Sequence, residues 1–542
     1  MPHVYRSPQG PIQGMFVGNA AEFIQSSPMV KANPDGVVYV DAKTGKQLTA
    51  RQAVDTIQAM AYVLRTEYNV RYDDVVCIFM KNTIYTPALH FGILSHGAVV
   101  SPANIAYLPE ELAHQLRVSR SKVVVTMPEF KDRVDKALKE EGVVVERVVL
   151  IDDLVRKVEA TTGRDLPVKL PGGLAREKDA YYCFSSGTSG LPKGVMTTHT
   201  NITSNCQQQY QSSFGFYTEG NVYGAVLPMS HIFGLAKFVY LTFYTCCTLV
   251  VFPQFELEPL LQAIIKYKIT HLHVVPPIVV LLAKSPVVDK YMDITKSLRG
   301  VMSGAAPLSE SLIKQVETRL PPISIKQGYG LTESSPVSHF FMYKNTYKKS
   351  SIGWLVPGQE ARIVDDEEND VPQGERGELW IRGPNIMRGY LRNPEATAET
   401  LTPDGFLRTG DIAMIDEDDQ FYIMDRKKEL IKSKGHQVAP AELEAILLKH
   451  PEVVDCAVTG AFSEEEQSEL PRGYVVLRHP SEKVAIEVKQ WFDEGVARHK
   501  RLWGGICIID AVPKNASGKL LRRALRTNSK NDKPLGMKTA KL

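Results

Sequence analysis

Short runs of β-branched and other apolar residues alternate with stretches of helical periodicity, most clearly from about residue 180 onward. Residues 247–252 (CTLVVF) predict a strand, and the next segment predicts a helix that opens at Pro259 and carries leucine and isoleucine on one face. The segment HLHVVPP predicts the strand that follows. Alternation of this kind is typical of parallel βαβ units.

The same alternation continues on both sides of this segment. SLRGVMSG and ISIKQGYG predict two further strands, and Ser309 between them is placed to cap a helix with an apolar face. In the earlier half, residues 75–80 and 121–127 predict strands of the same apolar kind. We therefore expect an α/β fold built from doubly wound βαβ subdomains.

Two changes of composition indicate how the chain is divided. Residues 365–378 (DDEENDVPQGERGE) predict an acidic hairpin, and residues 425–435 form a dense basic run. We place a domain boundary at the basic run, which gives domains of 1–425 and 426–542. Beyond it, a helix opened by Pro440, three strands (DCAVTGAF, GYVVLRH and GICIIDAV) and a further helix predict a small α+β domain. The polar tail beyond Arg526 is expected to be disordered.

Composition narrows the class of protein. The chain has 542 residues, 44% of them hydrophobic, so it can form several sizeable cores. Its 64 Lys and Arg residues face 61 Asp and Glu residues, and the net charge of +3 gives no reason to expect a nucleic-acid partner. Seven scattered cysteines suggest neither a disulfide framework nor a zinc site, and they favour an intracellular compartment.

Membrane attachment and secretion are not indicated. The N-terminal residues lack the basic start and apolar run of a secretory signal peptide. The longest uncharged stretch, residues 238–255, is interrupted by three threonines and Pro253. It predicts a buried helix followed by a strand better than a membrane span. We expect no stable membrane anchor.

The segment SSGTSGLPKG, Ser185 to Gly194, follows a predicted strand and has the composition of a phosphate-binding loop. Small residues let backbone N–H groups point inward, hydroxyls donate hydrogen bonds, and Lys193 adds positive charge. The Walker A pattern occurs nowhere in the chain, which argues against P-loop kinases and NTPases. For this segment alone, a flexible surface turn is the alternative.

This segment resembles the phosphate loop of the adenylate-forming superfamily, which includes acyl-CoA synthetases, 4-coumarate–CoA ligases, luciferases and peptide-synthetase adenylation domains. Further motifs follow in that family's order, namely PMSHIFG (228–234), SGAAPL (303–308), QGYGLTES (327–334), RTGD (408–411), DRKKELIKSKGHQVAPAELE (425–444) and PKNASGKLLRR (513–523). PPIVVLLAKSP (276–286) leans towards the 4-coumarate–CoA ligase branch. The resemblance implies a large AMP-binding domain with a small β-rich subdomain, followed by a small, mobile C-terminal lid domain.

The resemblance also implies a chemistry, in which a carboxylate attacks the α-phosphate of ATP to give an acyl-adenylate and pyrophosphate. Lys519 would bridge the two anions, Thr332 would contact the α-phosphate, and Glu333 would hold Mg²⁺. Taken alone, each would read as an ordinary surface residue. The implied ATP- and AMP-binding set is Ser185, Ser186, Gly187, Thr188, Ser189, Gly190, Lys193, Gln327, Gly328, Tyr329, Thr332, Asp411, Arg426 and Lys519.

A second half-reaction would follow, in which the thiol of CoA attacks the same carbonyl. Family behaviour implies that the small domain rotates about a hinge at Lys428 and withdraws Lys519. Lys432, Lys434 and Gly435 would then border the adenylate and the CoA tunnel, with Lys432 as a catalytic residue. The alternative for this cluster is a charged, solvated loop.

The acyl pocket follows from the same resemblance, with His231 at the junction of the acyl group and the adenylate. The implied lining is His231, Phe233, Lys237, Ala305, Gly330, Pro336, Val337 and Phe340. Two positions depart from the plant 4-coumarate–CoA ligase pattern: Lys237 stands where those enzymes have a small polar residue, and Gln254 replaces a lysine that contacts CoA. Lys237 either reaches outward to solvent or faces a polar or second acidic group on the substrate.

We therefore expect a Mg²⁺- and ATP-dependent acid–CoA ligase for an aryl or medium-chain carboxylic acid. The alternatives are an adenylating enzyme that loads a carrier protein, one that oxidises its product as luciferases do, and a non-catalytic nucleotide-binding protein. The presence of both half-reaction lysines, with Glu333 and Asp411, argues against the last. The sequence does not identify the acid or the oligomeric state.

The last three residues, Ala540, Lys541 and Leu542, match the small–basic–leucine pattern of a peroxisomal address. The preceding tail is polar, as a segment read by an import receptor requires. We expect a peroxisomal protein, with the cytosol as the alternative.

Overall fold

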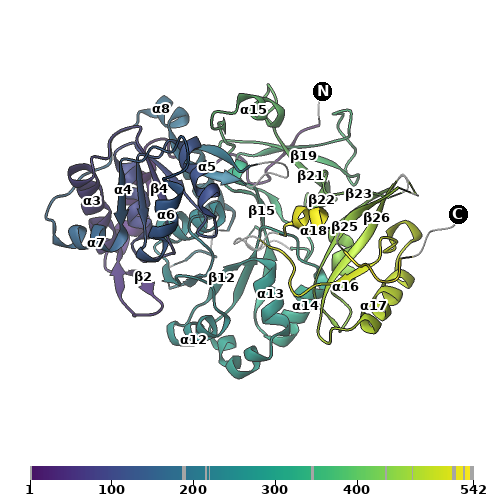
Figure 1. Ribbon diagram of the computed structural model, residues 1–542. Coiled ribbons are helices and arrows are strands. Elements are labelled where there is room, and N and C mark those ends of the chain that lie inside the picture. The colour runs from purple at the N-terminus through teal and green to yellow at the C-terminus, as the bar shows by residue number, and fades with distance from the viewer. Residues whose placement is uncertain are drawn as a thin grey trace.

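The structure is a computed structural model that describes residues 3–185, 191–213, 216–218, 220–342, 347–433, 436–464, 466, 468–514, 520–528 and 532–537. Two parallel sheets lie side by side in its large domain, a β-rich subdomain lies beside them, and the last part of the chain forms a small domain at one side (Figure 1). The predicted α/β class is confirmed.

The first large sheet has the strand order β20-β9-β8-β5-β4-β6-β7 within the described residues. Strands β8, β5, β4, β6 and β7 run parallel, whereas β9 and β20 are antiparallel to their neighbours. The bounds are β4 Val75–Phe79, β5 Val99–Pro102, β6 Val123–Thr126, β7 Arg147–Leu150, β8 Asp179–Ser185, β9 Lys193–Thr198 and β20 Gly389–Tyr390.

The second large sheet has the order β14-β13-β12-β10-β11-β2-β3, and all but β3 run parallel. The bounds are β2 Val37–Asp41, β3 Gln47–Thr49, β10 Val222–Ala225, β11 Thr248–Val251, β12 His271–Val274, β13 Gly300–Ser303 and β14 Ser324–Gln327. Apolar side chains from both sheets belong to one continuous core. The near-continuous apolar runs read from the sequence are explained by this burial on both faces.

The β-rich subdomain has its own core, separate from that of the two large sheets. Its main sheet is antiparallel in the order β1-β18-β19-β21-β22, and a smaller sheet has the order β15-β16-β17. The bounds are β1 Tyr5–Arg6, β15 Tyr329–Gly330, β16 Val337–Phe340, β17 Trp354–Leu355, β18 Glu360–Val364, β19 Gly377–Arg382, β21 Leu407–Ile415 and β22 Phe421–Arg426. The expected acidic hairpin is the β18–β19 connection.

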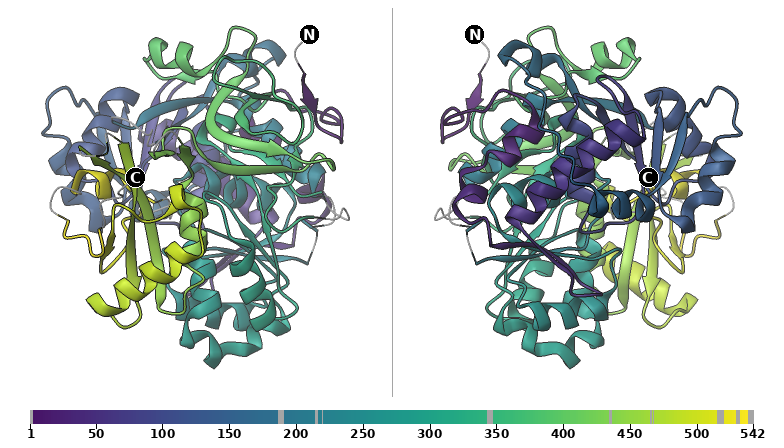
Figure 2. Two further views of the ribbon diagram at one scale, coloured as in Figure 1. Left: turned by 90° about the vertical axis from the view of Figure 1, so that its right-hand side faces the viewer. Right: turned by 90° about the vertical axis from the view of Figure 1, so that its left-hand side faces the viewer.

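The small domain is a separate lobe against one side of the large domain (Figures 1 and 2). Helix α17 Glu482–Glu494 packs on strand β27 Ile506–Ile508 around a third core. Its other elements are β23 Ile431–Ser433, β24 His436–Val438, α16 Pro440–Leu447, β25 Val453–Ser463, β26 Ser468–Leu477, the 3₁₀ turn η5 Arg498–Lys500 and α18 Arg522–Asn528. The predicted α+β character is confirmed.

The helices of the large domain connect and cover its sheets (Figure 1). Those before β10 are α1 Ala20–Gln25, α2 Pro28–Ala32, α3 Ala50–Glu67, α4 Thr86–Ser95, α5 Pro109–Ser119, η1 Pro128–Phe130, α6 Lys131–Ala137, α7 Ile151–Ala160, α8 Gly172–Glu177 and α9 His199–Ser212. Those after it are α10 Ile232–Gly234, the π-helix η2 Leu235–Leu241, α11 Thr242–Tyr244, α12 Leu257–Tyr267, α13 Pro276–Lys284, η3 Pro286–Lys296, α14 Glu310–Arg319, η4 Thr332–Ser334 and α15 Pro394–Thr400.

Local expectations agree with these bounds at most positions. Ser309 is the N-cap of α14, where its Oγ accepts a hydrogen bond from the Leu312 N–H at 3.3 Å. Helix α12 begins at Leu257, two residues before the predicted Pro259, because proline is accepted throughout a first helical turn, where no intrahelical N–H bond is lost. Residues 238–255 form buried helix and then strand, and no helix in the described ranges is long and apolar enough to cross a membrane.

The expectation of a disordered tail beyond Arg526 is wrong for residues 532–537. Leu535 pairs with Ile506 beside β27 and packs against the core of the small domain. Asp532 accepts hydrogen bonds from Tyr474 Oη at 2.6 Å and from Arg472 Nη1 at 3.1 Å. The sequence offers only Pro534, Leu535 and Met537 as apolar residues for this docking, too little to outweigh the polar composition around them.

All seven cysteines are buried and none forms a disulfide. Burial raises the pKa of the Cys77 and Cys183 thiols to about 12. These thiols therefore act as small apolar groups in the core.

Candidate functional site

A cavity of about 430 Å³ opens where the strands of the large domain end. Ser185 at the end of β8, Ser303 at the end of β13 and Gly328 just after β14 all line it. A second cavity of about 370 Å³ shares Tyr329 and Arg426 with the first. In open α/β sheets, ligands bind at the carboxyl ends of the strands, so this is the candidate site.

One end of the site is built from paired polar groups. Asp411 on β21 and Arg426 on β22 lie opposite each other in the antiparallel sheet, with Arg426 Nε 3.4 Å from Asp411 Oδ1. Tyr329 Oη donates a hydrogen bond to Asp411 Oδ2 at 2.5 Å. Asp411 is 3% exposed, so this is not a surface ion pair. Burial and the neighbouring Asp411 charge raise the pKa of Tyr329 well above its ordinary value, which keeps the phenol a hydrogen-bond donor.

Gln327 holds two backbone segments together beside this group. Its Oε1 accepts the Leu308 N–H at 2.7 Å and its Nε2 donates to the Lys349 carbonyl at 3.0 Å. The side chain therefore fixes the loop that contains SGAAPL. Tyr347 Oη accepts the Gln327 N–H at 2.7 Å.

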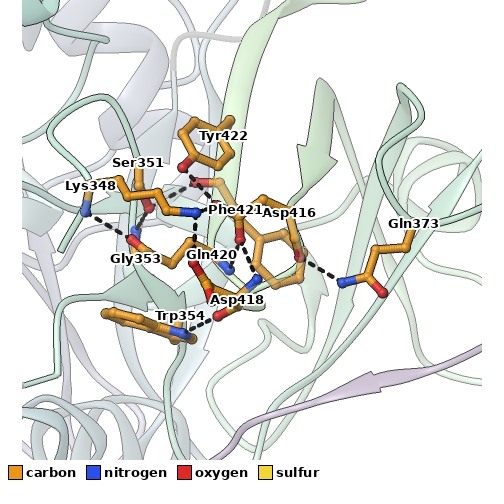
Figure 3. Close-up of polar contacts among 10 residues, drawn as sticks. All are labelled: Lys348, Ser351, Gly353, Trp354, Gln373, Asp416, Asp418, Gln420, Phe421 and Tyr422. Carbon is orange, nitrogen blue, oxygen red and sulfur yellow. Dashed lines mark hydrogen bonds and ion pairs between the residues drawn. The ribbon is translucent and has the colours of Figure 1, made fainter. Parts of the chain in front are cut away.

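The segment that supplies Tyr347 is itself anchored to the β21–β22 turn (Figure 3). Lys348 Nζ lies 2.7 Å from Asp416 Oδ2, which also accepts a hydrogen bond from Tyr422 Oη at 2.9 Å. Trp354 Nε1 donates to the Asp418 carbonyl at 2.9 Å. The β-rich subdomain thus supports the wall that Gln327 and its neighbours form.

Thr332 and Glu333 lie on the 3₁₀ turn η4, directly after β15, and both line the cavity. Tyr390 Oη donates to Glu333 Oε1 at 2.9 Å, and burial, reinforced by the Glu333 charge, raises the pKa of Tyr390. Lys193 Nζ lies 5.0 Å from the centre of the Tyr390 ring. Glu333 therefore keeps its second oxygen for another partner.

The predicted phosphate loop is only partly described. Ser185 lines the cavity. Lys193 begins β9 and lies opposite Ser185 in the sheet, but it does not line this cavity. The predicted ligands Ser186, Gly187, Thr188, Ser189 and Gly190 lie outside the described residues.

The other end of the site is largely apolar. His231 is the N-cap of α10 and its Nδ1 accepts the Phe233 N–H at 3.2 Å. Phe233, Ala305, Gly330, Pro336, Val337 and Phe340 line the cavity with it, as expected. A Cβ at Gly330 would lie 2.1 Å from the Pro336 carbonyl oxygen, so glycine is required where these two segments cross.

Lys237 lines the same cavity and is 1% exposed. Its Nζ lies 4.2 Å from the centre of the Phe340 ring and 3.4 Å from Tyr217 Oη. Of the two expected orientations, the outward one is wrong. The stem of Lys237 starts from a helix that is buried throughout, so it cannot bring the ammonium to solvent.

Helix α9 supports this wall and was not anticipated from the sequence. It is rich in Asn, Gln and Thr, yet almost all of its residues are buried. Asn205 Nδ2 donates to the Val337 carbonyl at 2.7 Å and its Oδ1 accepts the Val337 N–H at 3.2 Å. Asn201 Nδ2 reaches the Ile386 carbonyl at 2.9 Å. The polar composition of this helix predicts an exposed position, which is the opposite of what the structure shows.

The small domain closes one side of the cavities. Lys514 and Leu521, on either side of residues 515–519, line the first cavity, and Lys514 and Arg522 line the second. Lys519 itself lies outside the described residues, as do Lys434 and Gly435. Lys284 of the large domain donates to the Val453 carbonyl of the small domain at 3.1 Å.

Two other predicted residues of the small domain lie away from the cavities. Lys428 is exposed in the turn after β22. Lys432 is exposed on β23, where its backbone N–H donates to Glu469 Oε2 at 2.9 Å. The structure therefore does not bring Lys432 to the cavities. Gln254, the second departure noted in the sequence, is hydrogen-bonded to Glu256 at 2.8 Å.

Comparison with known proteins decides the family. Residues 28–391 match the AMP-binding enzyme family, and residues 442–519 match the AMP-binding enzyme C-terminal domain. The chain belongs to the AMP-binding enzyme family. The two matched regions lie on either side of the predicted boundary after residue 425, and the boundary itself stays a prediction. The resemblance to the adenylate-forming superfamily is confirmed.

Relatives of this AMP-binding enzyme match it over nearly its whole length. A protein named probable 4-coumarate–CoA ligase 1 of Dictyostelium discoideum is 39% identical over 92% of this chain and 93% of its own. The 4-coumarate–CoA ligase 1 of Petroselinum crispum is 36% identical over 91% of both chains. The crystal structure of ATP-bound MatB from Rhodopseudomonas palustris superposes with a TM-score of 0.84 at 25% identity, covering 95% of this chain and 99% of that one.

Proposed function

We propose that this AMP-binding enzyme converts an aryl or medium-chain carboxylic acid, ATP and CoA to acyl-CoA, AMP and pyrophosphate. Its class is that of an ATP-dependent, AMP-forming acid–CoA ligase, which follows from the family and from relatives at 36–39% identity. The relatives named 4-coumarate–CoA ligase support an aryl acid. The observation that carries the proposal is a single cavity with Glu333 and Arg426 at one end and His231, Phe233 and Phe340 at the other.

In the first step, a carboxylate oxygen of the acid attacks the α-phosphorus of ATP and the bond to the β-phosphate breaks. The products are the acyl-adenylate and pyrophosphate. Lys519 would neutralise charge that develops between the two anions, and the Thr332 hydroxyl would donate to the α-phosphate. Asp411 would accept hydrogen bonds from both ribose hydroxyls, since a carboxylate is an acceptor only.

The residues at the phosphate end fit a Mg²⁺ ion that arrives with ATP. Glu333 offers one carboxylate oxygen that Tyr390 does not occupy, and no cluster of three or more potential metal ligands occurs among the described residues. Mg²⁺ is commonly held by one or two carboxylates together with substrate phosphates, which this arrangement provides. Bound there, the ion would neutralise phosphate charge.

In the second step, the thiol of CoA loses its proton, its sulfur attacks the carbonyl carbon of the adenylate, and AMP leaves. The exposed position of Lys432 supports a rotation of the small domain between the steps, because only a different orientation would bring that residue to the cavities. Lys428 lies in the exposed turn where such a rotation would be centred. Lys434 and Gly435 would border CoA in the rotated state.

A panel of acids tests the proposal. The purified protein is given ATP, Mg²⁺, CoA and one acid at a time, and both pyrophosphate release and the mass of the product are measured. We expect an acyl-CoA from at least one aryl or medium-chain acid. Pyrophosphate release without acyl-CoA would contradict the proposal and favour transfer to a carrier protein, whereas oxygen uptake would favour a luciferase-like reaction.

We also propose a peroxisomal location, which is supported by Ala540, Lys541 and Leu542 at the C-terminus. These residues lie outside the described ranges. A fluorescent protein fused to the N-terminus should colocalise with a peroxisomal marker and become diffuse when Leu542 is deleted. Diffuse fluorescence from both forms would contradict the address and favour the cytosol.

A further inference from the structure

Lys237 is the charged residue of the cavity lining that lies on a buried π-helical stretch. It is on η2, a π-helical stretch between α10 and α11, and the Thr242 N–H bonds to the Lys237 carbonyl five residues earlier. All seven residues of this stretch are buried. π-Helical turns widen a helix locally and occur frequently at functional sites.

Within the part of the chain that the structure describes, no carboxylate forms an ion pair with the Lys237 ammonium. Burial and the Cys206 thiol are the influences on its charge. Its polar contact is Tyr217 Oη at 3.4 Å, and that hydroxyl also contacts His273 Nε2 at 3.1 Å. The ammonium also lies 4.2 Å from the centre of the Phe340 ring and 5.8 Å from the centre of the Tyr217 ring.

A buried ammonium with one long hydrogen bond and two aromatic rings beside it, but no carboxylate among the described residues, is poorly compensated. Transfer of a charge from water to a low-dielectric interior costs several kcal/mol, whereas a desolvated cation–π contact returns about 2 kcal/mol. Burial lowers the pKa of Lys237 to about 7, which reflects this cost. The wall of the acid pocket thus carries a lysine whose charged form no carboxylate among the described residues balances.

A hydroxyl that lines the same cavity has no hydrogen-bond partner among the described residues. It belongs to Ser303, which lies at the end of β13 and is 1% exposed. Its neighbour Met302 pairs in the sheet with His273, the residue that contacts Tyr217. Buried hydroxyls are ordinarily hydrogen-bonded, so this one is available to a ligand.

We propose that the acid bears a second acidic group, a carboxylate, which Lys237 binds at the apolar end of the cavity while the reacting carboxylate lies at the adenylate end. The substrate class is then a dicarboxylic acid activated at one carboxyl. The inference rests on the proposed ligase function and makes its substrate more specific. The Tyr217 hydroxyl and the Ser303 hydroxyl would supply the remaining hydrogen bonds to the distal carboxylate.

Pairing with an anion would restore the charge of Lys237. Three titratable groups lie around it. They are Cys206 on α9, Tyr217 between α9 and β10, and His273 on β12. The pKa of Cys206 is raised and that of His273 is lowered, in both cases chiefly by burial, so neither carries charge near neutral pH. A bound carboxylate would therefore draw a proton to Lys237 above pH 7.

Matched pairs of acids test the proposal directly. Each dicarboxylic acid of a graded series is compared with the monocarboxylic acid that has a methyl group in place of the distal carboxyl, and kcat/KM is measured by pyrophosphate release with CoA present. We expect at least one pair in which the wild-type enzyme prefers the diacid by about 10-fold or more. Preference for the methyl partner in every pair would overturn the proposal without any variant.

The variant Lys237→Met keeps the length of the side chain and removes its charge. We expect kcat/KM for the preferred diacid to fall about 100-fold, with the methyl partner unchanged or improved. Lys326→Met is the matched control, since Lys326 Nζ lies 4.1 Å from the Phe341 ring but does not line the cavity. Equal losses on both acids of a pair in Lys237→Met, or the same selectivity change in Lys326→Met, would overturn the proposal.

Calorimetry gives a readout that does not depend on turnover. Diacid binding to the wild-type protein at pH 8, measured in two buffers of different ionisation enthalpy, should take up a proton, and Lys237→Met should show no uptake. If Lys237→Met fails to fold by circular dichroism, Lys237→Gln takes its place. Failure of every acid, monoacids included, would count against the ligase function, whereas turnover of monoacids alone would count only against the role of Lys237.

Discussion

The two ends of the cavity differ in how their charges are paired. At the adenylate end, Asp411 is held by Tyr329 and Arg426, and Glu333 is held by Tyr390. At the acyl end, Lys237 has no ionic partner among the described residues and the Ser303 hydroxyl has no hydrogen bond. The named carboxylates of the adenylate end have hydrogen-bond or ionic partners before any substrate binds, whereas the ammonium of the acyl end has no carboxylate beside it among the described residues.

This difference separates nucleotide binding, which every acid requires, from selection of the acid. Every acid needs the same nucleotide, so the groups at the adenylate end can be fixed in place in advance. The acid pocket, in contrast, has to select an acid, and an ammonium without an ionic partner favours the substrate that neutralises it. Changes at the adenylate end should therefore affect all acids alike, and changes at the acyl end should affect them unequally.

The largest expected effect belongs to Lys519→Ala. Removal of this cation should lower the rate of adenylate formation about 1000-fold for every acid, since one preorganised transition-state contact is worth up to that factor. The use of a supplied acyl-adenylate with CoA should stay largely intact. Single-turnover assays of each half-reaction measure both.

Lys432→Ala is the counterpart in the same domain. It should slow thioester formation more than adenylate formation, because the structure keeps Lys432 away from the cavities in the present orientation. Equal losses in both half-reactions for both variants would contradict a division of labour between them.

Asp411→Asn should follow with a loss of about 100-fold in kcat/KM. The change leaves Arg426 without its charged partner and weakens the bond to Tyr329, and a charge-assisted hydrogen bond contributes about 1.5–3 kcal/mol. The loss should be the same for a preferred and a poor acid. A loss of kcat/KM for only one of the two acids would contradict the view that the adenylate end affects all acids alike.

Tyr390→Phe should have a smaller effect, about 10-fold, and should raise the Mg²⁺ concentration that gives half-maximal rate. The lost hydrogen bond orients Glu333, and its value lies in the range for charged acceptors. Tyr422→Phe is the control, because Tyr422 makes the same kind of bond to Asp416 away from the cavities. A similar Mg²⁺ shift in the control would show that the effect is not local.

Ser303→Ala should have the smallest effect and the most selective one. It should lower kcat/KM about threefold for acids with a polar distal group and leave apolar acids unchanged. Because it removes a buried hydroxyl that lacks a partner, it should also raise the thermal midpoint of the free protein. A lower midpoint with uniform loss would indicate that Ser303 has a structural partner instead.

Local signals in the sequence predicted much of the fold and of the site. The cap at Ser309, the apolar strand runs and the order of the motifs are all readable within a few neighbouring residues. The motifs also placed Thr332, Glu333, Phe233 and Lys237 around one cavity.

Contacts between distant segments were not readable. Asn205 supports Val337 across 132 positions, and Tyr390 orients Glu333 across 57, so no local pattern pairs them. Lys237 is the clearest case, since its spacing suggested the pocket but its burial depends on how η2 packs in the core. A sequence reports which residues occur together, whereas burial and charge compensation are properties of the folded chain.

The burial of all seven cysteines has a practical consequence for watching this enzyme at work. Thiol-reactive dyes attack the exposed thiolate, a form that buried thiols rarely adopt. One cysteine introduced on the surface of each domain would therefore react far faster than the native set. Energy transfer between two such dyes could then follow the orientation of the small domain during turnover, and the seven native cysteines would not have to be removed first.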